Sequence, residues 1–115
     1  MPTDYPWMLT EMAGPDGTMT TPITIPTLAF EDGSASGNAS CNQYFGSYEI
    51  DGSSLTFGPL ASTEMFCGEP GVMDQETQYL AALQQAATYR VDAMMLEMFD
   101  ADDTRLVQYQ RAATP

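Results

Sequence analysis

Short runs in which apolar and polar residues alternate occupy the first half of the chain. Residues 5–11 show this two-residue period, which predicts a strand with one buried face, and Pro6 favours a place at the edge of a sheet. Residues 20–30 are rich in β-branched side chains and predict a second strand, where a break in the alternation near Pro26 indicates a bulge. The residues expected on its buried face are Ile23, Ile25, Leu28 and Phe30.

Glycine, asparagine and aspartate separate these runs and predict the turns. Turns are expected at residues 14–17 and 31–34, and the Asp-Gly pair at 51–52 predicts a hairpin from which the chain returns and stays extended over residues 55–66. Residues 36–50 predict a strand interrupted by a loop or bulge, because they contain several residues that tolerate a positive φ. These residues are Gly37, Asn38, Asn42 and Gly46.

The pattern changes from a period of two to a helical period at about residues 72–87. Apolar residues recur there at spacings of three, four and seven, which predicts one buried stripe on a helix of about four turns. The stripe consists of Val72, Met73, Tyr79, Leu80, Leu83, Ala86 and Ala87. Acidic residues favoured by the positive end of the helix dipole are Glu69, Asp74 and Glu76.

Three short strands are predicted after the helix, at residues 88–91, 94–99 and 105–109. Turns at residues 92–93 and 100–103 separate them, so an antiparallel meander is the simplest connection. The fold class is therefore expected to be α+β, mainly antiparallel β, with a single helix.

The length of the chain indicates the number of domains, and its charge limits the kinds of partner that it could bind. At 115 residues the chain is expected to form one domain over residues 1–115. Sixteen acidic residues face three arginines and no lysine or histidine, giving a formal net charge of -13 that disfavours nucleic acid. The acids are spread along the chain, which favours a solvated anionic coat over a dedicated surface for cations or basic partners.

The missing residue types exclude much chemistry. Without histidine or lysine the chain cannot assemble a Ser-His-Asp, Cys-His or Ser-Lys pair, a histidine-containing zinc site or a Schiff base. Residues 100–104 look like the start of a calcium loop, but the glycine and glutamate that complete an EF-hand are missing. No catalytic residue, metal or cofactor is therefore expected, and the protein is not expected to be an enzyme.

The chain has two cysteines, Cys41 and Cys67, and their oxidation state would indicate the cellular compartment of the protein. An even count in a small domain favours a disulfide over free buried thiols, and a disulfide favours a periplasmic, outer-membrane-associated or secreted protein. Free cysteines would instead indicate the cytoplasm. No apolar run reaches the roughly 20 residues of a membrane-spanning helix, and a signal or lipidation segment is expected to be absent from this chain.

Two groups of residues are candidates for binding. Loops on a rigid scaffold often carry binding residues, which makes a polar cluster a candidate recognition patch. The structural alternative, which is favoured, is that the same side chains brace a chain reversal. The cluster consists of Asn38, Asn42, Gln43, Tyr44 and Tyr48. The second group is the methionine-rich run 94–98, where alternation forces at least one apolar side chain outward as a candidate interaction surface.

Several blocks of the chain resemble the META domain family of HslJ-like heat-shock and envelope proteins. They are CNQYFGSY at 41–48, DGSSLTF at 51–57, STEMFC at 62–67 and MDQETQYL at 73–80, with Trp7, Phe30, Leu83, Tyr89, Leu96 and Val107 also in register. The resemblance implies a small, incompletely closed β-barrel of about eight strands packed against one helix. The chain departs from the family pattern in its methionine-rich residues 93–99.

The family resemblance, together with the missing catalytic residues, predicts a non-catalytic binding or envelope-stress-response module. A protein partner or a small apolar, lipid-like ligand is expected, and the domain is expected to be a monomer. The alternative is a protease inhibitor acting through an exposed loop, such as residues 68–71 or 100–104.

Overall fold

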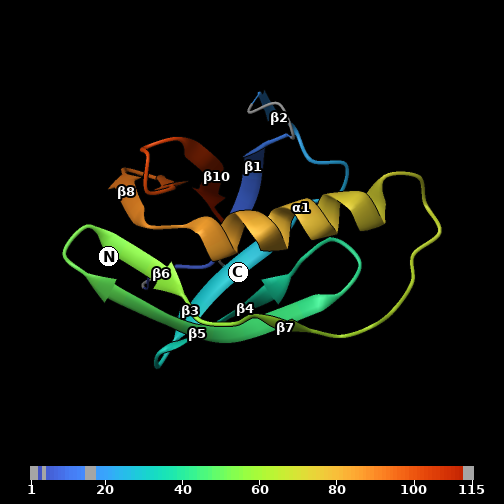
Figure 1. The fold of residues 1–115 in the computed structure, drawn as a ribbon, viewed down its shortest axis with the longest axis horizontal. Coiled ribbons are helices and arrows are strands. Elements are labelled where there is room, and N and C mark those ends of the chain that lie inside the picture. The colour runs from blue at the N-terminus through green and yellow to red at the C-terminus, as the bar shows by residue number, and fades with distance from the viewer. Residues whose placement is uncertain (1–2, 4, 15–17, 113–115) are drawn as a thin grey trace.

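The strands of the protein close into a ring. The computed structural model describes residues 3, 5–14 and 18–112. Eight antiparallel strands follow one another around the ring in the order β1-β3-β4-β5-β6-β8-β9-β10 and back to β1, while β2 and β7 are short additions (Figure 1). The elements are β1 (Trp7–Ala13), β2 (Met19–Thr20), β3 (Thr27–Glu31), β4 (Ser34–Asn38), β5 (Gln43–Asp51), β6 (Ser54–Phe57), β7 (Ala61–Ser62), α1 (Val72–Gln85), β8 (Thr88–Asp92), β9 (Met95–Phe99) and β10 (Arg105–Arg111).

The predicted fold class is confirmed. The ring of strands has its shortest hydrogen-bonded pairing between β6 and β8. Only one ladder pair, Ser54 with Thr88, joins these strands. Two further bonds support it, from Leu55 N–H to the carbonyl of Ala87 and from Tyr89 N–H to the carbonyl of Ser53. In Figure 1, α1 runs lengthwise through the molecule, with β3 to β7 on one side of it and β1, β8 and β10 on the other. No helix among the described residues has the length and apolar character needed to cross a membrane.

The prediction that residues 5–11 form an edge strand is wrong. β1 pairs with β10 along most of its length and also with β3, so both of its edges are occupied. Pro6 does not interfere, because it precedes the strand and only its carbonyl is used, accepting a bond from Ala112 N–H. The N–H of Gly14 donates to the carbonyl of Thr18 across the predicted turn, of which residues 15–17 lie outside the described residues.

The predicted strand over residues 20–30 forms only in its second half. Leu28 and Phe30 are buried in β3, but Ile23 and Ile25 are 62% and 56% exposed. Pro22 and Pro26 flank these two residues and lack the N–H that a ladder needs. The segment is therefore a surface loop, contrary to the prediction.

The chain reversal after β4 works differently from the prediction. The positive φ in this stretch belongs to Ser40, at 133°, and not to the four residues that the sequence indicated. Gly37 is needed for space instead, because a Cβ there would lie 2.1 Å from the carbonyl oxygen of Thr27. Close packing of the β4 backbone against the start of β3 thus explains this glycine.

The helix buries two polar residues, Gln75 and Glu76, that are absent from the predicted apolar stripe. Glu76 was expected to interact with the helix dipole, but it and Gln75 are buried, whereas Leu80 is only partly covered. Both lie three and four residues after Val72, and Tyr79 follows at seven, so they occupy the inward stripe. Gln75 donates to the carbonyl of Thr24 at 2.8 Å and accepts from the N–H of Ile23, which fixes the loop before β3.

The meander after the helix is present as predicted. Leu96 and Met98 are buried in β9, while Met94 in the preceding turn is 51% exposed and Met95 is also exposed, so apolar side chains do face outward here. Glu97 faces the same way as Met95 but is covered by Arg90 and Arg105, whose guanidinium nitrogens lie 2.6 and 2.8 Å from its carboxylate oxygens. The hydrogen bond from Arg105 lowers the pKa of this carboxyl, and burial opposes that effect less strongly.

A chain of three tyrosine hydroxyls crosses the core. The Tyr44 hydroxyl donates to the carbonyl of Thr27 at 2.7 Å, so it must accept from Tyr79 at 2.8 Å, and Tyr79 must in turn accept from Tyr109 at 2.7 Å. Burial raises the pKa of all three hydroxyls. Together with Trp7 these tyrosines are among the largest fully buried side chains of the core.

Candidate functional site: a braced segment between β7 and α1

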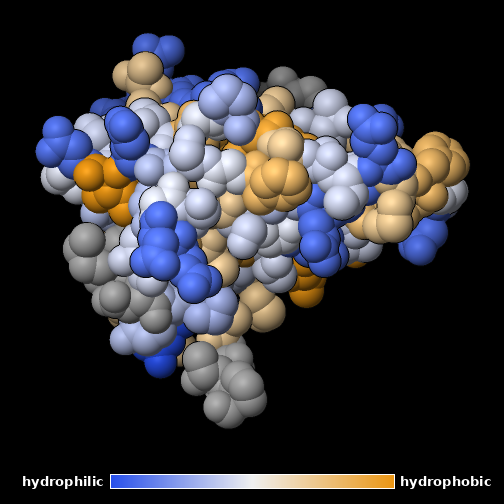
Figure 2. All heavy atoms as spheres, turned by 90° about the horizontal axis from the view of Figure 1, so that it is seen from below, coloured by the Kyte–Doolittle hydropathy of each residue, from blue (hydrophilic) through white to orange (hydrophobic). Residues whose placement is uncertain are grey.

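The segment from Ala61 to Gly71 is exposed along its whole length except for half-buried Cys67. Phe66 is 83% exposed and Met65 is 57% exposed. In Figure 1 this segment arcs away from the body beyond the start of α1, and Figure 2 shows apolar side chains gathered at the same end of the molecule. Two consecutive residues thus expose large apolar side chains to solvent.

The backbone of this exposed segment is nevertheless held firmly. Thr63 N–H donates to the carbonyl of Gln43 at 3.0 Å. The side chain of Asn42 binds both backbone groups of Met65: its Oδ1 accepts from Met65 N–H at 2.6 Å, and its Nδ2 donates to the Met65 carbonyl at 3.0 Å. The predicted disulfide is present, and joins Cys67 to Cys41 with 5.9 Å between the Cα atoms. The chain is therefore anchored immediately before and after Phe66.

These anchors all use alternate residues. In an extended chain the N–H and C=O of one residue point to one side and those of the next residue point to the other. Because Thr63 and Met65 face the barrel, the backbone groups of Glu64 and Phe66 face outward. β7 pairs with β5 alone among the described strands, so its outer edge continues into this outward-facing run. The segment therefore offers, beside the Phe66 side chain, backbone groups at Glu64 and Phe66 that have no hydrogen-bond partner among the described residues.

A buried carboxylate supports the grip of Asn42. Oε1 of Glu76 accepts from the backbone N–H groups of Cys41 and Asn42, at 3.0 and 2.6 Å, and Oε2 accepts from Nδ2 of Asn42 at 2.8 Å. Burial raises the pKa of Glu76, but these three hydrogen bonds together outweigh it and lower the pKa. The negative charge of Glu76 is thus held by N–H donors, and α1 locks the loop that carries Asn42. We call Asn42, Glu76 and the Cys41–Cys67 disulfide the brace.

The structure does not gather the five predicted binding residues into one patch. Asn42 is in the brace, and Tyr44 is in the buried tyrosine chain. Asn38 and Gln43 are exposed and face each other across the β4–β5 ladder. Tyr48 packs edge-to-face on Phe30 with ring centroids 4.8 Å apart. The two buried members thus form hydrogen bonds inside the fold, and Asn38 and Gln43 are the two members that face solvent.

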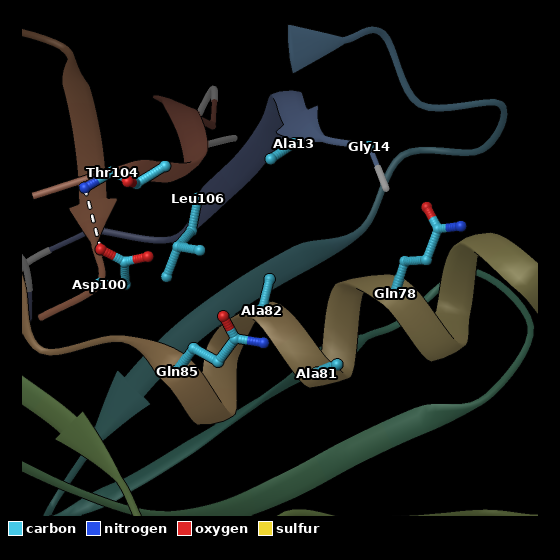
Figure 3. Close-up of a pocket in the computed structure, with 9 residues that line it drawn as sticks. All are labelled: Ala13, Gly14, Gln78, Ala81, Ala82, Gln85, Asp100, Thr104 and Leu106. Atoms are coloured by element: carbon cyan, nitrogen blue, oxygen red, sulfur yellow. Dashed lines mark hydrogen bonds between the residues drawn. The ribbon is translucent and has the colours of Figure 1, made fainter. Parts of the chain in front are cut away.

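A shallow groove of about 360 Å³ lies beside α1 (Figure 3). Gln78, Ala81 and Gln85 form its wall on the helix, and the opposite wall comes from the end of β1 and from residues 100–106. Its one carboxylate, Asp100, already accepts from the backbone N–H groups of Asp102 and Thr104. The groove is lined mainly by small apolar side chains and two side-chain amides, a lining that suits the binding of a small neutral ligand.

The comparisons with known proteins agree with this architecture. The model of the META domain family matches residues 2–113. No curated protein matches the chain. A protein from Burkholderia xenovorans solved by NMR is 28% identical, with a TM-score of 0.79 over 98% of this chain and 85% of that one. A DUF4847 family protein from Bacteroides vulgatus is 13% identical, with a TM-score of 0.74 over 100% and 97% of the two chains, and so shares the fold.

Proposed function

The chain belongs to the META domain family, and on this premise we propose that it is a non-catalytic binding module that recognises a protein partner through the braced segment. The observation that carries the proposal is Phe66, a large apolar side chain 83% exposed on a backbone fixed by Asn42 and the disulfide. Exposed aromatic side chains are the usual anchors of protein interfaces.

The brace favours binding for an energetic reason. A partner that captures a flexible loop must offset the entropy lost on ordering it, about 0.5–1.5 kcal/mol for each immobilised side chain and more for the backbone. Here the ordering has already taken place during folding, through the bonds from Asn42 and the disulfide. Folding free energy is thus used to hold a surface segment in one shape, which benefits recognition.

The disulfide also supports an oxidising compartment such as the periplasm or the extracellular space. Cys41 and Cys67 are 26 positions apart, and closing such a loop stabilises the fold by about 3.5 kcal/mol on the chain-entropy model. A role in the envelope stress response belongs to the same proposal and rests on the resemblance to heat-shock members of the family.

Site-specific photo-crosslinking tests this function. A benzophenone amino acid replaces Phe66 in one sample and Met94, another exposed apolar residue, in a matched control. In envelope extract of the source organism we expect a defined crosslinked protein from position 66 and none from position 94. Excess wild-type protein should compete the product away, and excess Phe66→Ala protein should not. Equal labelling from both positions, or equal competition by both proteins, would contradict the proposal.

A further inference from the structure

We propose that the partner is a serine protease with a deep apolar specificity pocket, and that Phe66 is the side chain that enters this pocket. The inference rests on the proposed function and names its partner class. It assigns the segment around the Phe66–Cys67 bond as an inhibitory loop, immediately before the 68–71 turn that the sequence indicated.

The backbone of the braced segment has the form such a protease binds. Serine proteases hold the chain before the scissile bond as an extended strand paired antiparallel with their own main chain, which is a form of strand addition. The pairing uses the residue before the scissile bond and the residue two positions earlier, while the one between faces away. In this chain the backbone groups of Glu64 and Phe66 face outward, whereas the backbone N–H and carbonyl of Met65 between them face the side chain of Asn42.

The side chain and its surroundings select the class of protease. A pocket lined as a hydrophobic slot, as in chymotrypsin, accepts phenylalanine, and full burial of such a ring removes about 150–250 Å² from water. Glu64 and Glu69 are exposed on either side of Phe66, within a chain of net charge -13. The protease is therefore expected to carry basic residues around its cleft, which also speeds association.

The brace explains why the bond would inhibit the protease and not simply be digested. When the oxygen of the protease serine attacks the carbonyl carbon of Phe66, it forms an ester there and the bond to the Cys67 nitrogen breaks. That nitrogen takes up the proton of the serine hydroxyl and leaves as an amine. The amine cannot diffuse away, because Cys67 remains bonded to Cys41 and Met65 remains held by Asn42. Re-formation of the peptide bond then competes with hydrolysis by water, and hydrolysed protein keeps its two pieces joined by the disulfide.

Inhibition of chymotrypsin by the intact, oxidised protein tests the inference. We expect stoichiometric, competitive inhibition of the hydrolysis of a small chromogenic substrate, weakened at least about 100-fold in Phe66→Ala and unchanged in Met94→Ala. Residue 66 lies on the surface, so both variants are expected to melt as the wild type does. Rapid digestion of the wild type without inhibition, or inhibition that Phe66→Ala leaves intact, would overturn the inference.

A change of specificity provides a second arm. Trypsin carries an aspartate at the base of its pocket, so Phe66→Arg should lose inhibition of chymotrypsin and gain inhibition of trypsin. No gain against trypsin would count against a loop that docks in the substrate orientation. If neither protease is inhibited while crosslinking from position 66 still yields a specific partner, the protease inference fails and the binding function stands. Failure of both experiments removes both.

Discussion

Raising the pH above about 10 is expected to unfold the protein in one cooperative step, because the unfolded chain releases tyrosine protons that the folded chain retains. Burial raises the pKa of Tyr44, Tyr79 and Tyr109 in the folded state. A group whose pKa is raised by folding contributes its full stabilisation below the unfolded pKa and loses it as the pH rises. Three such groups lower the free energy of unfolding by about 4 kcal/mol for each pH unit above 10.

Circular dichroism and tyrosinate absorbance, followed together against pH, measure this transition. A domain with about 8 kcal/mol of stability would unfold near pH 12, and the chain has no lysine to titrate in the same range. Tyr109→Phe is the informative variant, because Tyr109 donates at the end of the chain and its loss leaves no hydroxyl without an acceptor. The slope should fall by about a third. Ionisation of all three tyrosines in a folded protein would contradict this account.

Asn42→Ala is expected to lower the free energy of unfolding by about 3–4 kcal/mol. Four hydrogen bonds are lost, to Thr63, to Glu76 and to both backbone groups of Met65, at about 1 kcal/mol each. The carboxylate of Glu76 also loses one of its donors while it remains buried.

Urea unfolding of the wild type, of Asn42→Ala, of Glu76→Gln and of the double variant measures the loss of stability for each replacement. It also measures the coupling free energy between the two residues. The two residues share hydrogen bonds, so the double variant should lose less than the sum of the single losses. Asn38→Ala is the matched control, because Asn38 is exposed and its amide accepts only one bond, from Ser40 N–H. A loss for Asn42→Ala no larger than for Asn38→Ala would show that the brace is not formed.

Much of the fold could be predicted, because its strands and helix obey local patterns. The Asp51-Gly52 hairpin and the meander after the helix follow from turn residues placed between alternating runs. What failed depends on neighbours distant in sequence. The β1 strand is internal because β10 returns from the far end of the chain to cover it. Apolar Ile23 stays on the surface because Gln75 holds its backbone in a loop.

The site was harder to predict than the fold. The sequence singled out Asn42 and Cys41 and left a structural role open for the polar cluster, but gave no reason to connect Asn42 with Glu76, 34 positions away. Spacing from Val72 did place Glu76 on the inward stripe, and a carboxylate there signals a buried partner. Phe66 resembled any apolar residue of an extended run, since only the path of the chain beyond β7 decides its exposure.

Residue-resolved amide hydrogen exchange of the oxidised protein tests most directly whether the exposed segment is held in place. Thr63 and Met65 should exchange slowly, because their N–H groups donate to Gln43 and Asn42. Glu64 and Phe66, whose N–H groups face solvent, should exchange near the rate of an unstructured peptide. Fast exchange at all four positions would mean that Phe66 sits on a flexible loop, and the account of a pre-ordered recognition segment would be wrong.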